Sequence, residues 1–123
     1  MKLNSSNEDY LKAILVLQKE LGQVRSVDLS RYMGYTKASI SHAISCLRKN
    51  GIVIMDDDFY LHLTDDGLSI AEKIYERHQY FMEKLLAAGV NPETADKEAC
   101  KMEHAVSDET FEQLRNAQLK QEG

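Results

Sequence analysis

A thiol, a carboxylate and an imidazole stand close together in the segment EACKMEHAVSDE, as Cys100, Glu103 and His104. On an α-helix, the spacings i, i+3 and i+4 place three side chains within an arc of about 100° on one face. Sulfur and imidazole nitrogen favour iron, cobalt or zinc, while a carboxylate oxygen also suits manganese. The triplet therefore predicts a divalent transition-metal site. A solvated helix face with one buried cysteine is the alternative that these residues leave open.

Metal-dependent catalysis is disfavoured by the rest of the chain. Helical di-iron bundles take a Glu-x-x-His motif from each of two helices and further glutamates from two others, and this chain offers no second copy of such a motif. A catalytic zinc site needs an open coordination position and a nearby base in a pocket, for which the sequence has no pattern. We therefore expect a protein that is not an enzyme.

The length of 123 residues gives room for one compact unit or for two small lobes that share a core. No stretch approaches the roughly 20 apolar residues of a membrane span, and the first residues, MKLNSSNEDY, lack the apolar core of a signal peptide. Cys46 and Cys100 lie far apart without CxxC spacing, which argues against a disulfide framework. We expect a cytoplasmic protein with no membrane partner.

The net charge of −5 is unevenly distributed along the chain. Residues 1–54 carry eight Lys and Arg against four Asp and Glu, whereas residues 55–123 carry seven against sixteen. The first part is therefore +4 and the second −9. A local basic surface is what contact with phosphates requires, so the acidic total does not exclude a nucleic-acid partner.

The first third of the chain has the pattern of three helices. The segment SSNEDYLKAILVLQKELG predicts a helix capped by Ser5 and ended by Gly22, with an apolar stripe made by Tyr10, Leu11, Ile14, Leu15, Leu17 and Leu21. The segments SVDLSRYMG and TKASISHAISCLRKNG predict two short helices, capped by Ser26 and Thr36 and each closed by a glycine. Two short helices joined by a tight turn are typical of a helix-turn-helix.

The spacing of the apolar residues no longer fits a helix after Gly51. The β-rich runs IVIM and FYLHL, separated by three aspartates, predict a hairpin with an acidic tip. A long helical region capped by Thr64 follows, and two more helices are capped by Asn91 and Ser107. We expect a mostly α protein with a small β-hairpin: a winged helix-turn-helix domain at residues 1–64, then an all-helical domain at residues 65–123.

The second helix of a helix-turn-helix lies in the major groove, where side chains near its N-terminus meet base edges. Ser41 and His42 are candidates for base edges, and Thr36 and Ser39 for bases or phosphate. Basic side chains nearby suit phosphate contact. An ordinary polar helix face is the alternative. The candidate DNA-binding residues are Arg25, Thr36, Lys37, Ser39, Ser41, His42 and Arg48.

The chain resembles the diphtheria-toxin-repressor family of iron- and manganese-dependent repressors from residue 5 to about residue 115. The matching stretches are EDYLKAI, LSRYMGYTKASISHAISCLRKNGIV, LTDDG, ERHQYF and EACKMEHAVSDE, in that order. The resemblance implies a homodimer that binds double-stranded operator DNA when loaded with metal and represses uptake genes. It also implies that the helical domain binds the metal and forms the dimer.

The resemblance places the metal ligands at Asp9, His78, Cys100, Glu103 and His104. It is a hybrid set, because Asp9 matches the manganese branch of the family and Cys100 the iron branch. Lys12 and Met82 stand where the manganese branch has glutamates, so we expect about one ion per subunit. Fe2+ or Mn2+ is the implied physiological ion, with Co2+, Ni2+ or Zn2+ as substitutes in vitro. A winged-helix regulator that senses a small molecule or a protein partner is the alternative function.

Overall fold

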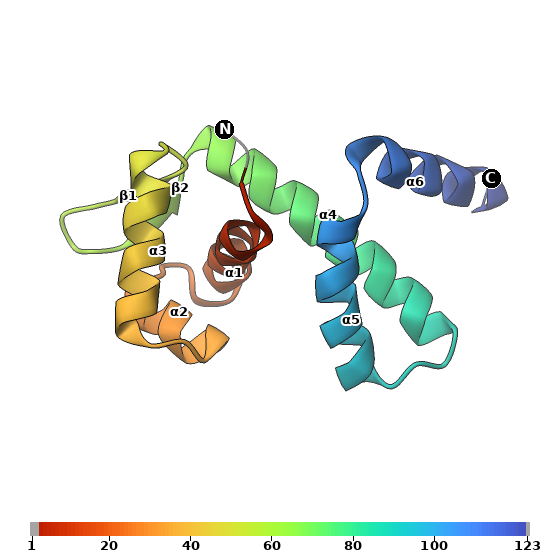
Figure 1. Cartoon of the computed structure of the whole chain (residues 1–123), viewed down its shortest axis with the longest axis horizontal. Helices are drawn as coiled ribbons and strands as arrows, with labels where there is room; N and C mark the ends of the chain where they lie inside the picture. The colour runs from red at the N-terminus through yellow and green to blue at the C-terminus, as the bar shows by residue number, and fades with distance from the viewer. Residues whose placement is uncertain (1–2, 123) are drawn as a thin grey trace. The chain divides into compact units, whose positions relative to one another are not determined.

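The structure, a computed structural model, describes residues 3–122. It forms two compact units, divided between Ile74 and Tyr75 within helix α4 (Figure 1). The expected fold class, mostly α with one hairpin, is confirmed. The elements of the described chain are α1 Ser5–Leu21, α2 Ser26–Met33, α3 Lys37–Lys49, β1 Val53–Met55, β2 Leu61–Leu63, α4 Asp65–Ala87, α5 Pro92–Ala105 and α6 Asp108–Glu122.

The core of the first unit is built from the apolar faces that the periodicity predicts. Helix α1 contributes Leu11 and Ile14, helix α3 contributes Ile40 and Leu47, and all four are fully buried. Leu21 is a correction, because it is 56% exposed at the last residue of α1, where the chain turns at Gly22 with φ +84°. The core holds α3 by one face, so the other face of this helix is free to carry polar residues.

Four of the six predicted helix caps are confirmed. The side-chain oxygens of Thr36, Thr64, Asn91 and Ser107 each accept a hydrogen bond from a backbone N–H in the first turn of the helix that follows. Helix α1 is instead capped by Asn4, which accepts from the N–H of Asn7 at 2.8 Å, because Asn caps as well as Ser and stands one residue earlier. Ser26 is already the first residue of α2.

The wing pairs β1 with β2 in antiparallel register, with Ile54 opposite His62. Val24 forms a further bridge to Leu61, so β2 lies between β1 and the segment before α2. Gly67, in the first turn of α4, approaches the sheet so closely that an added Cβ would lie 2.0 Å from the carbonyl oxygen of Ile52. This contact requires glycine and fixes where α4 leaves the wing.

The tip of the wing is organised by the carboxylate of Asp56. One oxygen accepts from the N–H groups of Asp58 and Tyr60, both at 2.9 Å, and the other lies 2.8 Å from Nε2 of His62. The hydrogen bond with His62, followed by that from the Tyr60 backbone, holds the pKa of Asp56 below its usual value. Phe59, at φ +68° and 68% exposed, closes the turn.

We expect the wing to loosen in acid through Asp56. A carboxyl whose pKa is lowered by folding stabilises the fold above its unfolded pKa of about 3.9, and this stabilisation is lost as the pH falls through the lower folded value. Hydrogen-exchange protection of the Tyr60 amide, measured relative to amides of α1, should fall below pH 4 in the wild type. In Asp56→Ala the protection should be low already at pH 7.

Asp57→Ala is the matched control, because it removes a neighbouring carboxylate for which the described structure shows no hydrogen bond. It should keep the protection and the acid sensitivity of the wild type. If Asp56→Ala loses protection along the same pH curve as the wild type, Asp56 does not organise the wing.

Candidate metal centre and nucleic-acid interface

Helix α5 presents the thiol, carboxylate and imidazole triplet in the second unit. The helix starts at Pro92, where proline is well tolerated, and Asn91 caps it. Its buried face consists of Ala95, Ala99 and Glu103, at a spacing of four residues. Cys100 and His104 flank this face and are half-buried. The small alanines allow α5 to pack closely, so Glu103 reaches the interior with a fully buried side chain.

His78, on helix α4, lies between two carboxylates of α5. Its Nδ1 is 2.9 Å from Oε2 of Glu103, and its Nε2 is 3.0 Å from Oδ1 of Asp96. The sulfur of Cys100 lies 3.7 Å from the same Nδ1. The other oxygen of Glu103, Oε1, lies 3.4 Å from Nε2 of His104. The second unit thus brings together four of the five residues that the resemblance identifies.

Asp96 is a member of this cluster that the sequence analysis did not single out. Ligand-type atoms of His78, Asp96 and Cys100 all lie within 4.8 Å of one another. The signal was present in the spacing, because Asp96 precedes Cys100 by four residues and His104 by eight, on the same side of a helix. It was hidden because acidic residues are abundant throughout this half of the chain.

The donor set fits a divalent transition metal. Thiolate, imidazole and carboxylate are together suited to iron, cobalt and zinc, and the carboxylates also admit manganese. A carboxylate as buried as that of Glu103 is costly without a cation or hydrogen-bond donors beside it. The imidazoles of His78 and His104 lie beside its two oxygens, and a bound ion would offset its charge.

Asp9, the remaining residue of the expected ligand set, lies on α1 in the first unit and is half-buried. Lys12 follows it by one helical turn and is also half-buried. The assignment of Asp9 as a ligand comes from the resemblance.

The expected DNA-contacting residues all lie on the surface of the first unit. Arg25 precedes α2, Thr36 caps α3, and Arg48 lies in the last turn of α3. All seven candidates are exposed, including Lys37, Ser39, Ser41 and His42 on the first two turns. Thr36 also has a structural role, because its hydroxyl oxygen accepts the N–H of Ser39 at 3.1 Å. The guanidinium of Arg25 lies 4.3 Å from the centre of the Tyr60 ring, beside the tip of the wing.

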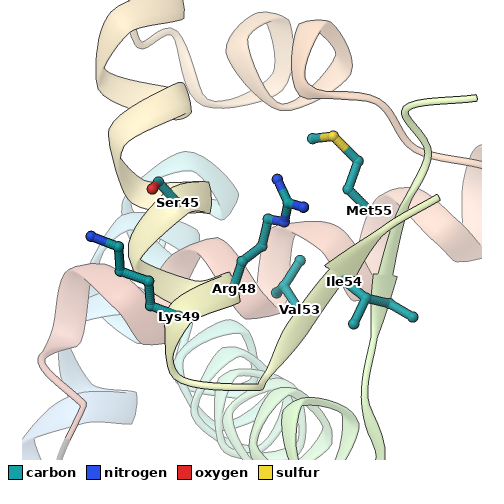
Figure 2. A pocket seen from close by; sticks show the side chains of 6 residues that line it. All are labelled: Ser45, Arg48, Lys49, Val53, Ile54 and Met55. Carbon is teal, nitrogen blue, oxygen red and sulfur yellow. The ribbon is translucent and has the colours of Figure 1, made fainter. Parts of the chain in front are cut away.

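An open hollow of about 460 Å³ lies where the end of α3 meets β1. Ser45, Arg48 and Lys49 line it from the helix, and Val53, Ile54 and Met55 line it from the strand (Figure 2). Figure 2 shows the Lys49 ammonium on the side of Ser45 and the Arg48 guanidinium on the side of Met55. Basic side chains therefore occur at both ends of α3, Lys37 in its first turn and Arg48 and Lys49 in its last, where they suit contact with phosphates.

Comparison with known proteins matches both parts of the chain. Residues 2–59 match the family described as iron dependent repressor, N-terminal DNA binding domain. Residues 64–118 match iron dependent repressor, metal binding and dimerisation domain. The transcriptional regulator MntR of Escherichia coli is 34% identical over 88% of this chain and 70% of its own length. An HTH-type transcriptional regulator of Methanocaldococcus jannaschii is 31% identical over 92% of both chains.

Solved structures with a similar fold include metal-dependent regulators. A manganese-dependent transcriptional repressor, solved in complex with manganese, matches 90% of this chain with a TM-score of 0.78 and 28% identity. The manganese regulator SloR matches 94% of this chain with a TM-score of 0.76 and 25% identity. This chain spans about half the length of these two solved chains, 51% and 55% respectively.

Among the described residues, no helix combines the length and the apolarity that a membrane crossing requires. The relatives are regulators of transcription, in agreement with the expectation that the chain is not an enzyme. Because a DNA-binding domain and a metal-binding domain are matched in the same order over nearly the whole chain, the protein belongs to the iron-dependent repressor family of metal-responsive transcriptional regulators.

Proposed function

We propose that the protein represses transcription of metal-uptake genes by binding operator DNA as a homodimer when a divalent transition metal is bound. The observation that carries this proposal is the cluster of His78, Cys100, Glu103 and His104 in a chain whose other unit is a winged helix-turn-helix. A regulator that senses a small molecule instead of a metal is not favoured, because it gives no reason for a buried glutamate between two histidines.

The proposed ligands are Asp9, His78, Cys100, Glu103 and His104, and the proposed ion is Fe2+ or Mn2+. We place the ion on the Nδ1 side of His78, because Glu103 and Cys100 lie on that side. Asp96 faces the other ring nitrogen, Nε2, so it accepts the N–H that remains and orients the ring. In this role Asp96 is not a ligand, and the site needs one ion per subunit.

A bound ion supplies the positive charge that offsets the clustered carboxylates. The residues of the chain do the rest. Glu103, His104 and Cys100 hold their donors on one face of α5, and His78 adds a donor from α4. Asp9 adds a donor from the helix that carries the core of the DNA-contacting unit. A coupling between metal binding and DNA binding on the order of 1 to 3 kcal/mol is enough to change operator occupancy many-fold.

A homodimer supplies two copies of α3 for two half-sites, which lie about 34 Å apart on one face of the DNA. The second family match supports dimerisation, since its description names that role. Exposed leucines on α4 and α6, among them Leu86 and Leu119, are apolar surface that a partner subunit would cover. We place the protein in the cytoplasm, where it meets both the DNA and the regulated metal pool.

The proposal is tested by titrating apoprotein with Mn2+, Fe2+, Co2+ or Zn2+ while measuring binding to DNA from upstream of metal-transport genes. DNA binding should rise with metal, fall after dialysis against a chelator, and saturate at about one ion per chain. Metal-independent binding would favour the regulator that senses another molecule. Two tightly bound ions per chain would contradict the stoichiometry and the role given to Asp96.

We expect two classes of effect among the DNA-contacting residues. His42→Ala should weaken binding to the operator by about 1 to 3 kcal/mol and leave binding to random duplex unchanged, as for a lost base contact. Lys37→Ala should lower affinity for both DNAs and reduce the salt dependence of binding, as for a lost phosphate contact. Competition between operator and random duplex measures the difference. Unchanged operator preference in His42→Ala would show that His42 does not read bases.

A further inference from the structure

Arg77, next to His78 on α4, is a charged side chain buried in the second unit and only 5% exposed. Its Nη1 donates to two backbone carbonyls at the end of α5, that of Glu103 at 3.2 Å and that of Val106 at 2.8 Å. Its Nη2 pairs with the carboxylate of Asp108, at the start of α6. Its guanidinium carbon lies 5.4 Å from the centre of the Phe111 ring. One guanidinium therefore joins α4, α5 and α6.

The contacts fall on the turn that carries the ligands. The last carbonyl groups of a helix lack partners within the helix, and a cation placed there is stabilised by the helix dipole. The planar fork of arginine reaches several acceptors at once, which a lysine ammonium does not do in the same geometry. Arg77 thus ties the last turn of α5, which bears Glu103 and His104, to the helix that bears His78.

This arrangement is costly for a contact that serves the fold alone. Removing a guanidinium from water costs hydration free energy, and the carboxylate that pairs with it, that of Asp108, is 72% exposed and offsets this cost only in part. The Nε of Arg77 is, in addition, buried without a hydrogen-bond partner among the described residues. The free-energy cost of burying the guanidinium is explained if the guanidinium holds the neighbouring metal ligands in position.

We propose that Arg77 is a positioning residue of the metal centre. Its guanidinium holds the end of α5 so that the donors of Glu103 and His104 already face His78 before an ion arrives. A metal ion then binds a site whose ligands need little rearrangement, which raises affinity and fixes the coordination geometry. This inference rests on the proposed function, because it concerns the same metal centre.

The test uses the full chain with Co2+ as the probe. Arg77→Lys keeps the positive charge and removes the planar fork of the guanidinium. Asp108→Asn removes only the negative charge of the α6 carboxylate that pairs with Nη2. Glu76→Gln is the matched control, because it breaks the exposed ion pair between Glu76 and Arg115, which also joins α4 to α6. For each variant, Co2+ affinity is measured by competition with a chelator, the visible absorption spectrum is recorded at saturation, and unfolding of the apoprotein is followed by circular dichroism.

Arg77→Lys should bind Co2+ at least about tenfold more weakly and show shifted ligand-field bands at saturation, because the ligands no longer meet the ion in the same geometry. Asp108→Asn should show a smaller loss in the same direction, and Glu76→Gln should match the wild type. A lower unfolding temperature with wild-type affinity and spectrum in Arg77→Lys would overturn the proposal and leave Arg77 a contact of the fold.

If Arg77→Lys does not fold, Asp108→Asn decides, and wild-type affinity and spectrum in that variant overturn the proposal. Failure of the proposed function has a different signature. Wild-type protein that binds no Co2+ would overturn the metal centre, and the positioning role with it. Wild-type protein that binds Co2+ normally, together with Arg77→Lys that does the same, overturns only the role of Arg77.

Discussion

Glu103→Gln is expected to lower metal affinity by more than about 100-fold and to abolish metal-dependent DNA binding at metal concentrations that saturate the wild type. Loss of an outer partner of a metal ligand already costs about 10- to 100-fold, and Glu103 is a proposed ligand itself. The change removes one charge and keeps the shape of the side chain. It therefore tests the carboxylate rather than the packing of a fully buried position.

The unfolding of the apoprotein separates this effect from a loss of structure. The amide of glutamine can still form a hydrogen bond with Nδ1 of His78, so Glu103→Gln should remain folded without metal. Glu98→Gln is the matched control, because it makes the same chemical change at an exposed position of α5. It should bind metal and DNA as the wild type does. Metal-dependent DNA binding with an unchanged midpoint in Glu103→Gln would remove Glu103 from the ligand set.

The fold could be predicted from local signals because they agree with one another. The helix-turn-helix, the hairpin and the later helices follow from apolar spacing, capping residues and glycines, each of which acts over a few residues. The errors lie where local signals are degenerate. The start of α1 reads Asn4, Ser5, Ser6, Asn7, and both residue types are good caps, so the sequence alone does not separate Asn4 from Ser5.

Only two kinds of site residue could be predicted from the sequence: those that share one helix and those that the family resemblance identifies. The triplet on α5 is visible from spacing within a single helix. Asp96 and Arg77 become visible only when α4 and α5 are packed, because their partners lie 18 and 26 residues away along the chain. Arginine is ordinarily a surface residue, and no local sequence pattern distinguishes a buried guanidinium from a solvated one. The packed structure alone shows that it reaches the carbonyl of a proposed ligand.

Cys100→Glu is expected to shift metal preference toward manganese. The thiolate of Cys100 is a soft ligand that favours Fe2+, Co2+ and Zn2+, and the carboxylates of Asp9 and Glu103 offset this only in part. A glutamate at this position would make the site richer in oxygen, as manganese prefers. Wild-type protein should therefore bind DNA weakly with Mn2+ and well with Co2+. In Cys100→Glu the ratio of the two half-saturating metal concentrations should change by about tenfold in favour of Mn2+.

The absorption spectrum of the Co2+ complex distinguishes the reasons for such a shift. A sulfur ligand gives a charge-transfer band in the near ultraviolet, which should be present in the wild type and absent in Cys100→Glu. Cys46→Ser is the control, because it removes the other cysteine, on α3 in the first unit. An unchanged manganese-to-cobalt preference, with no sulfur band in the wild type, would show that the thiol is not a ligand. Metal preference would then be set by the carboxylate oxygens and the two histidines.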